Sequence, residues 1–450
     1  MGLKQVEAGT AEKGNSRLLI TDGVLYYSSR YLFDYNVLVP AFVSQLGASA
    51  FLVGLAASIN RLAFFLPQIF VANHAVVRPL NKPLLLLGVK TYAFALICLI
   101  PFMLFLGSRA PLAALALFFL FYTIACAGDG IQALPWVDIL AKTVHTTRRG
   151  RLLGYMQTLA GIVSFGMAAL VAWVLSRAWL AFPINYMMLV FLAALLGLGS
   201  LKVLSLLQEP VRETTESRQP LKKYLGSMPK VVRENPGFKR FLLVRCLSQS
   251  FTLAAPFYVT YAIDVLGAPK GFMGGFIAAQ MAGVMVGGIF LGYVGDLAGN
   301  AWSVRLALAA SLGPPLVGLS LGYGMSGAGF GGPVIFLFLL LYFFLGAAQA
   351  GLWMTLQNYL LDLVNPSIRP TCVGFSNMLV APMSFLPMLG GIIVAAMGYK
   401  GLFAITLFMG LTSFCFSLKM QEPRKPSGDY PGRALFLPLR RALPFKNKHP

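Results

Sequence analysis

The stretch LGASAFLVG at residues 46–54 returns 220 positions later as LGAPKGFMG at residues 266–274. Other pairs keep the same offset: Tyr122 and Tyr342, Arg149 and Arg369, Gly154 and Gly374, and Ser164-Phe165 and Ser384-Phe385. A constant offset over most of a chain is the sign of an internal duplication. The sequence therefore predicts two halves built from one repeated unit.

Composition places this duplicated unit in a membrane. The 450 residues are 57% hydrophobic and 11% charged, whereas soluble domains carry about 25% charged residues. Twelve apolar segments approach or exceed the roughly 20 residues that cross a bilayer. We expect helices near 18–44, 50–72, 83–106, 111–141, 152–176, 183–207, 238–265, 271–294, 303–323, 333–364, 370–396 and 401–418. The predicted fold is an all-α integral membrane protein of two pseudo-symmetric six-helix bundles.

These spans divide the chain into five parts. We expect a cytoplasmic N-terminal segment (1–17), an N-terminal bundle (18–207), a cytoplasmic central loop (208–237), a C-terminal bundle (238–418) and a basic cytoplasmic tail (419–450). The first apolar segment is too long for a signal-peptide core and has no small-residue cleavage site after it. It is therefore expected to remain as a membrane helix.

The net charge of +21 is distributed unevenly over the loops. Of the 36 Lys and Arg residues, 28 lie on the side of the termini and 4 on the other side. This split is the positive-inside pattern, which predicts that both termini are cytoplasmic. We expect a multi-pass protein of the plasma (inner) membrane, embedded in the lipid bilayer as a monomer, and no nucleic-acid partner.

The sequence lacks the residue patterns that several classes of chemistry require. The five cysteines lie inside predicted helices without a CxxC or Cys/His spacing, which argues against a disulfide frame or a zinc site. The three histidines lie in loops or in the tail, and the absence of a Gly-Lys dipeptide excludes a Walker A loop. We predict no cofactor, no metal and no enzymatic activity.

Four loop segments carry a family resemblance. Residues 292–300 read GYVGDLAGN, residues 148–154 read RRGRLLG, and helices six and twelve leave through LQEP (207–210) and MQEP (420–423). With the twelve spans and the duplication, the chain resembles the major facilitator superfamily of secondary transporters over nearly its whole length. The resemblance implies alternating access around a central cavity lined by helices 1, 4, 7 and 10.

The resemblance also implies a gating contact, here called the cytoplasmic latch. Asp296, between Gly292 and Gly299, is expected to brace the start of the fifth helix when the halves close on the cytoplasmic side. An aspartate there meets the positive end of a helix and the arginine cluster Arg148, Arg149 and Arg151. The chain departs from the family pattern in the first half, where Val76 stands in place of the aspartate.

Charged residues inside the spans are costly and therefore informative. Arg30 and Asp34 lie one turn apart on the first helix, which suits either a structural ion pair or a substrate or proton site. Arg61 lies midway along the second helix, and the deep carboxylates that could pair with it are Asp34 and Asp129.

Other polar residues share helix faces. Tyr122, Asp129, Gln132 and Trp136 lie on one face of helix four, Gln349 and Trp353 on helix ten, and Arg245 and Gln249 on helix seven. These residues suit either a substrate site or interhelical packing and hydrogen bonding. For Arg245, snorkelling to the cytoplasmic interface is an equal alternative.

Together these features predict a secondary transporter of a small organic solute, coupled to protons through Asp34 or Asp129. Export of amphiphilic compounds is favoured, because the expected cavity is aromatic and sparsely charged. Uptake of an anionic metabolite is the alternative, and it rests on Arg30, Arg61 and Arg245. A third possibility of another class is a non-transporting sensor or assembly factor with the same fold.

Overall fold

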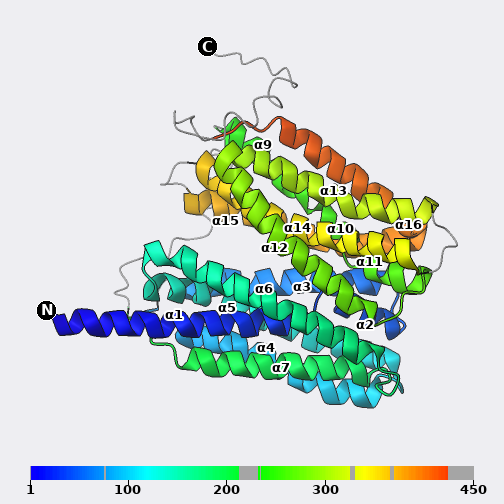
Figure 1. The fold of residues 1–450 in the computed structure, drawn as a ribbon, viewed down its shortest axis with the longest axis horizontal. Helices are drawn as coiled ribbons and strands as arrows, with labels where there is room; N and C mark the ends of the chain where they lie inside the picture. The colour runs from blue at the N-terminus through cyan, green and yellow to red at the C-terminus, as the bar shows by residue number, and fades with distance from the viewer. Residues whose placement is uncertain are drawn as a thin grey trace, which may run out of the picture.

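The computed structural model describes residues 2–75, 78–211, 232–233, 235–324, 330–364 and 369–423. Most of the predicted central loop, the tail beyond Pro423, and Val76 lie outside these ranges. The described part is helical and contains no strand. Figure 1 shows two helical bundles, with the N-terminal half below the C-terminal half.

The N-terminal half comprises α1 (Gly2–Tyr31), α2 (Leu38–Gln45), α3 (Ala50–Ala75), α4 (Lys82–Leu106), α5 (Pro111–Thr143), α6 (Thr146–Ser176) and α7 (Ile184–Ser205). The C-terminal half comprises α9 (Pro236–Leu247), η1 (Ser248–Ser250), α10 (Phe251–Ala254), α11 (Phe257–Thr260), η2 (Tyr261–Val265), α12 (Phe272–Ala298), α13 (Asn300–Gly324), α14 (Gly332–Leu363), α15 (Arg369–Val380), η4 (Ala381–Phe385) and α16 (Leu386–Leu418).

Ten stretches of the described chain are long and apolar enough to cross a membrane. The last, Cys372–Leu418, holds two of the predicted spans, because Gly398 interrupts the helix with a φ of 71°. The first predicted span is absent from the ten, because α1 is too polar along its 30 residues and α2 has only 8. The described chain therefore contains the twelve predicted spans.

The first span departs from the prediction of an unbroken helix over residues 18–44. Helix α1 begins at Gly2, within the expected polar segment, and residues 32–37 are not helical. The Asp34 carboxylate causes the restart, because its Oδ1 accepts the backbone N–H groups of Asn36 and Val37 at 2.8 Å each. A carboxylate in this position satisfies donors that a helix start leaves unpaired.

The seventh span has a corresponding break. Its α-helical run ends after Ala254, the repeat position of Asp34, and resumes at Phe257. Pro256 has no N–H to donate within a helix, which accounts for the interruption. The duplication therefore preserves the position of the break, although a different residue produces it in each half.

The two halves meet tightly at one end, here called the closed side, which carries the loops at 46–49 and 266–271. Here α3 crosses α16, where a Cβ on Gly54 would collide with the carbonyl of Pro387. In the same way α12 crosses α6, where a Cβ on Gly274 would collide with the carbonyl of Ala168. Gly54 and Gly274 are repeat mates, so the motif that revealed the duplication forms the contact between the halves.

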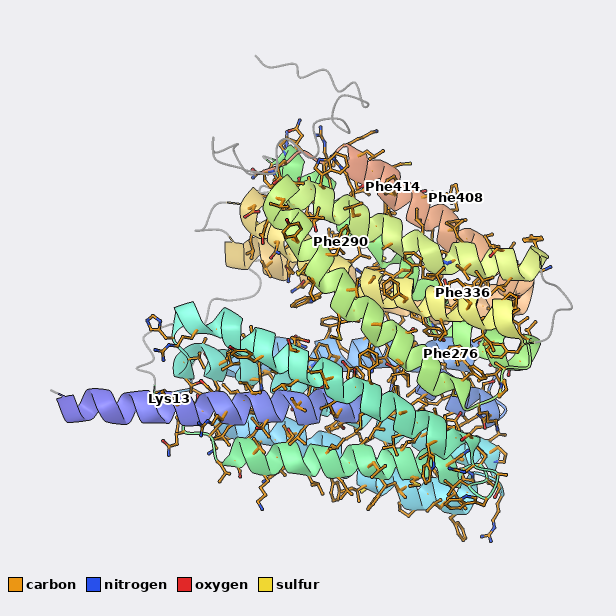
Figure 2. All side chains as sticks on the ribbon, in the orientation of Figure 1. Lys13, Phe276, Phe290, Phe336, Phe408 and Phe414 are labelled. Atoms are coloured by element: carbon orange, nitrogen blue, oxygen red, sulfur yellow. The ribbon has the colours of Figure 1, made fainter. Side chains whose placement is uncertain are left out.

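At the opposite end, here called the open side, the bundles diverge. Figure 1 shows the ribbons meeting around α2 and α11 and separating toward the N-terminal end of α1. Figure 2 shows Lys13 at this end and Phe276 toward the other. The inter-half backbone contacts described above lie on the closed side.

The LQEP and MQEP segments cap helix starts on the open side. The Glu209 carboxylate accepts the backbone N–H groups of Asn81 and Lys82 at 2.7–2.9 Å, and Lys142 Nζ lies 2.8 Å from its Oε1. In the other half, Glu422 accepts the N–H of Ala301 at 2.8 Å, at the start of α13. Negative charge at a helix N-terminus is stabilising, which explains why both repeats end with a Glu in the shared tripeptide Gln-Glu-Pro.

Candidate functional site

A buried ion pair joins α1 to α5. Arg30 Nη1 lies 3.2 Å from Asp129 Oδ2, and Gln132 Nε2 donates to Asp129 Oδ1 at 2.9 Å. Asp129 is only 2% exposed, and both of its oxygens have partners. Arg30 thus pairs with Asp129 and not with Asp34, because α1 ends at Tyr31 and Asp34 is taken up in capping α2.

Arg61 crosses from one half to the other. Its Nη1 donates to Gln249 Oε1 at 3.2 Å, and its guanidinium carbon lies 6.0 Å from the ring centroid of Phe251. Arg61 belongs to α3 of the first half, whereas Gln249 and Phe251 belong to η1 and α10 of the second. The predicted carboxylate partner, Asp34 or Asp129, is therefore wrong for Arg61, which contacts an amide instead.

Arg245 lies on α9, about one helical turn from Gln249. Its Nη2 donates to Asn377 Oδ1 on α15 at 2.8 Å. The residue is 8% exposed, and its Nε has no hydrogen-bond partner among the described residues. Asn377 is exposed. Arg245 therefore holds a fixed, largely buried position and does not snorkel to the helix end.

A second contact between the halves involves a residue that the sequence analysis missed. Gln349 Nε2 on α14 donates to the hydroxyl of Tyr35, and Gln280 Nε2 donates to Gln349 Oε1 at 3.2 Å. Tyr35 lies in the break between α1 and α2, and its polar neighbours Asp34 and Asn36 were the available signal. Trp353 lies one turn further along the face of Gln349 and is 70% exposed.

Two residues of the predicted helix-four face lie elsewhere. Tyr122 is 1% exposed and stacks on Phe118 with centroids 5.3 Å apart, and its hydroxyl has no partner in the described chain. Trp136 Nε1 donates to Asp22 Oδ2 at 2.8 Å, and Ser200 donates to the other oxygen. The four face residues span about 21 Å of helix axis. Their side chains leave the helix in the same direction but lie at different depths along its axis.

The cytoplasmic latch is not formed in this conformation. Asp296 is exposed near the end of α12 and has no ion pair within the described ranges. Arg149 caps the end of α5 instead, through the carbonyls of Val144 and Ala141 at 2.9 and 2.5 Å. Gly292 lies within α12 and Gly299 follows its end at φ 98°. Arg148 lies in the first turn of α6, and the side chain of Arg151 is outside the described set.

Comparisons with known proteins return structural likenesses only. No protein-family model matches the chain, and no curated protein sequence does. A bacterial homologue of the iron transporter ferroportin, in an inward-facing state, is 13% identical, with a TM-score of 0.69 over 90% of this chain and 98% of its own.

Two further solved structures give the same result. A D-xylose–proton symporter is 14% identical, with a TM-score of 0.69 over 91% of this chain and 98% of its own. A variant of the nucleoside transporter NupG is 14% identical, with a TM-score of 0.67 over 90% and 99%. The chain, built of two duplicated six-helix bundles, therefore has the same fold as these solved transporters.

Proposed function

We propose that this protein is a secondary transporter that moves a small organic solute by alternating access between its two halves. The observation that carries the proposal is a set of two of the polar contacts between the halves, Arg61 to Gln249 and Tyr35 to Gln349. These contacts lie within the spans, where polar groups are costly unless they serve binding. Transporters of this architecture place the substrate between their repeats.

The proposed orientation places the open side in the cytoplasm, with both termini there and the protein in the plasma membrane. The support is the excess of Lys and Arg in the loops of that side. The conformation described above is then the inward-facing one. It has the closed-side glycine contacts in place and the cytoplasmic latch apart.

We assign proton coupling to Asp129. In its ionised form both carboxylate oxygens are hydrogen-bonded, to Arg30 and to Gln132. Protonation would cancel the attraction that holds Arg30 and free its guanidinium to move. Asp34 is assigned to positioning, because its Oδ1 holds the start of α2.

Export of amphiphilic compounds receives less support than the sequence suggested. Tyr122 is packed in the core and Trp136 binds Asp22, so two of the aromatic residues expected to line the substrate path lie apart from the inter-half contacts. Arg61 and Arg245 by contrast both lie at or within about one turn of Gln249.

The test uses purified protein in liposomes loaded with a pH-sensitive dye. Four probes are added in turn. Succinate and phenyl phosphate are anionic, uridine is neutral and choline is cationic. We expect protein-dependent movement of at least one probe together with protons, and loss of the proton component in Asp129→Asn. Exchange of the transported probe across the membrane should persist in that variant.

Removing one member of a buried pair destabilises by about 3–5 kcal/mol, so Asp129→Asn is paired with a variant that also carries Arg30→Gln. The double variant removes both charges and should recover folding without recovering proton coupling. Ligand binding without movement of any probe would reject transport in favour of the sensor alternative. Undiminished coupling in the folded double variant would reject Asp129 as the proton site.

A further inference from the structure

We propose that the inter-half site binds a small organic anion through its carboxylate or phosphate group, held by Arg61 from one half and Arg245 from the other. The inference rests on the proposed function, because it names the substrate class of the same site. It follows from two arginines, one in each half, that lack a carboxylate partner in the described chain, and from the donors that they leave available there.

Two of the three deep arginines lack a carboxylate partner among the described residues. Arg30 is neutralised by Asp129 at 3.2 Å. Two other buried carboxylates of the first span are bonded elsewhere, Asp34 in capping α2 and Asp22 in accepting from Trp136. Arg61 and Arg245 each donate to an amide oxygen, and within the described part of the chain neither has a carboxylate at ion-pair distance. Two positive charges are thus left without protein counter-ions.

Such charges are expensive to keep within a membrane protein unless something compensates for them. A bound oxyanion would do so. An ionised acceptor makes stronger hydrogen bonds to a guanidinium than a neutral amide does, and it engages two N–H groups at once. Gln249 and Asn377 therefore act as neutral partners that an anion is able to displace.

The donors are arranged for a shared ligand. Arg61 reaches across the interface to Gln249, which lies about one turn from Arg245 on the same span. Arg245 is 8% exposed, yet its Nε has no partner among the described residues. Its other contact, Asn377, is exposed. Phe251, with its ring 6.0 Å from the Arg61 guanidinium, offers an apolar surface for the carbon part of the ligand.

The test is ligand-dependent thermal unfolding of the purified, full-length protein, which needs no transport activity. Succinate and phenyl phosphate serve as the anionic probes, and uridine and choline as neutral and cationic controls. We expect the anions to raise the unfolding temperature of the wild-type protein, because a ligand that binds only the folded state stabilises it. Comparison of the two anions then distinguishes a carboxylate from a phosphate ligand.

Arg61→Gln and Arg245→Gln should each weaken anion binding about ten- to a hundredfold, as expected for loss of a charge-assisted hydrogen bond. Arg61→Lys should restore part of the affinity, because it keeps the charge and loses the planar fork. The matched control is Arg177→Gln, which removes an exposed arginine on the closed side, where it lies over Trp173.

A second readout separates binding from a structural role. Both Arg→Gln variants remove an uncompensated charge, so without ligand they should unfold at or above the wild-type temperature. The inference is overturned if neither anion stabilises the wild type, if uridine or choline does so instead, or if the Arg61 and Arg245 variants bind anions like Arg177→Gln. Anion binding without movement in liposomes would uphold the inference and reject the transport proposal alone.

Discussion

Substitution of Gly274 by alanine should open the closed side. Gly274 lies on α12 where that helix crosses α6, and a Cβ there would collide with the carbonyl of Ala168. The Ala172 backbone nitrogen would lie 2.7 Å from the same carbon. Both obstacles are backbone atoms of a helix, which cannot rotate aside as a side chain can, so the two helices must move apart.

The added Cβ destabilises only the conformation in which the closed side is closed. Overpacking of a well-packed contact costs about 1–3 kcal/mol. Once α12 and α6 separate, the methyl group no longer clashes and the cost disappears. A difference of that size shifts a two-state equilibrium about five- to 150-fold. We therefore expect Gly274→Ala to move most molecules to the state that is open on this side. Gly54→Ala should act in the same sense through Pro387.

The measurement is the distribution of distances between spin labels at Ser49 and Val265, which are exposed on the closed side of the two halves. Gly274→Ala should add a population at longer distance. The control is Gly288→Ala on the same helix, where a Cβ meets no atom within 4 Å. Identical distributions in the two variants would refute the reasoning.

Three further predictions concern the open side. Glu209→Gln should lower the free energy of unfolding by about 1–3 kcal/mol, because it weakens the charged bonds to Lys142 and to the start of α4; an unchanged denaturation midpoint would contradict this. Asp296→Asn should favour the conformation described here and slow turnover, whereas Val76→Ala should do little, as judged by cysteine accessibility on both sides; equal accessibility in wild type and Asp296→Asn would exclude the latch. Tags at both termini and near Arg218 should report the cytoplasm, and an external signal near Arg218 would overturn the proposed topology.

The architecture was predictable because two strong signals in the sequence indicate it. Apolar length marks the spans, and the constant offset marks the duplication. The break in the first span was not predictable in this way, because hydropathy does not record that Asp34 turns its carboxylate onto the N–H groups of Asn36 and Val37. The reason for keeping Gly54 and Gly274 likewise became visible only in the helix crossings.

The candidate site was predictable in part. Helical spacing fixes the direction in which a side chain leaves its helix, but not which helix it meets or at what depth. Asp129 and Gln132, three residues apart, therefore act together, whereas Tyr122 and Trp136 from the same face do not. The partners of the arginines depend on contacts between spans, and no single-helix pattern holds that information.

The closed-side crossing and the arginine site are mechanically linked through α3. This helix carries Gly54, where it touches α16, and Arg61, where it bonds to Gln249 about 10 Å further along its axis. A rocking motion about the crossing must therefore move Arg61 relative to the second half, which holds Arg245. An anion bound to both arginines would have a different affinity in each conformation. Such coupling is reciprocal. If succinate or phenyl phosphate lengthens the Ser49–Val265 distance, Gly274→Ala, which favours the longer distance, must raise the affinity for that anion. If the anion shortens the distance, Gly274→Ala must lower the affinity. A mismatch of sign would show that Gly274→Ala changes the affinity by a route other than this equilibrium between the two conformations.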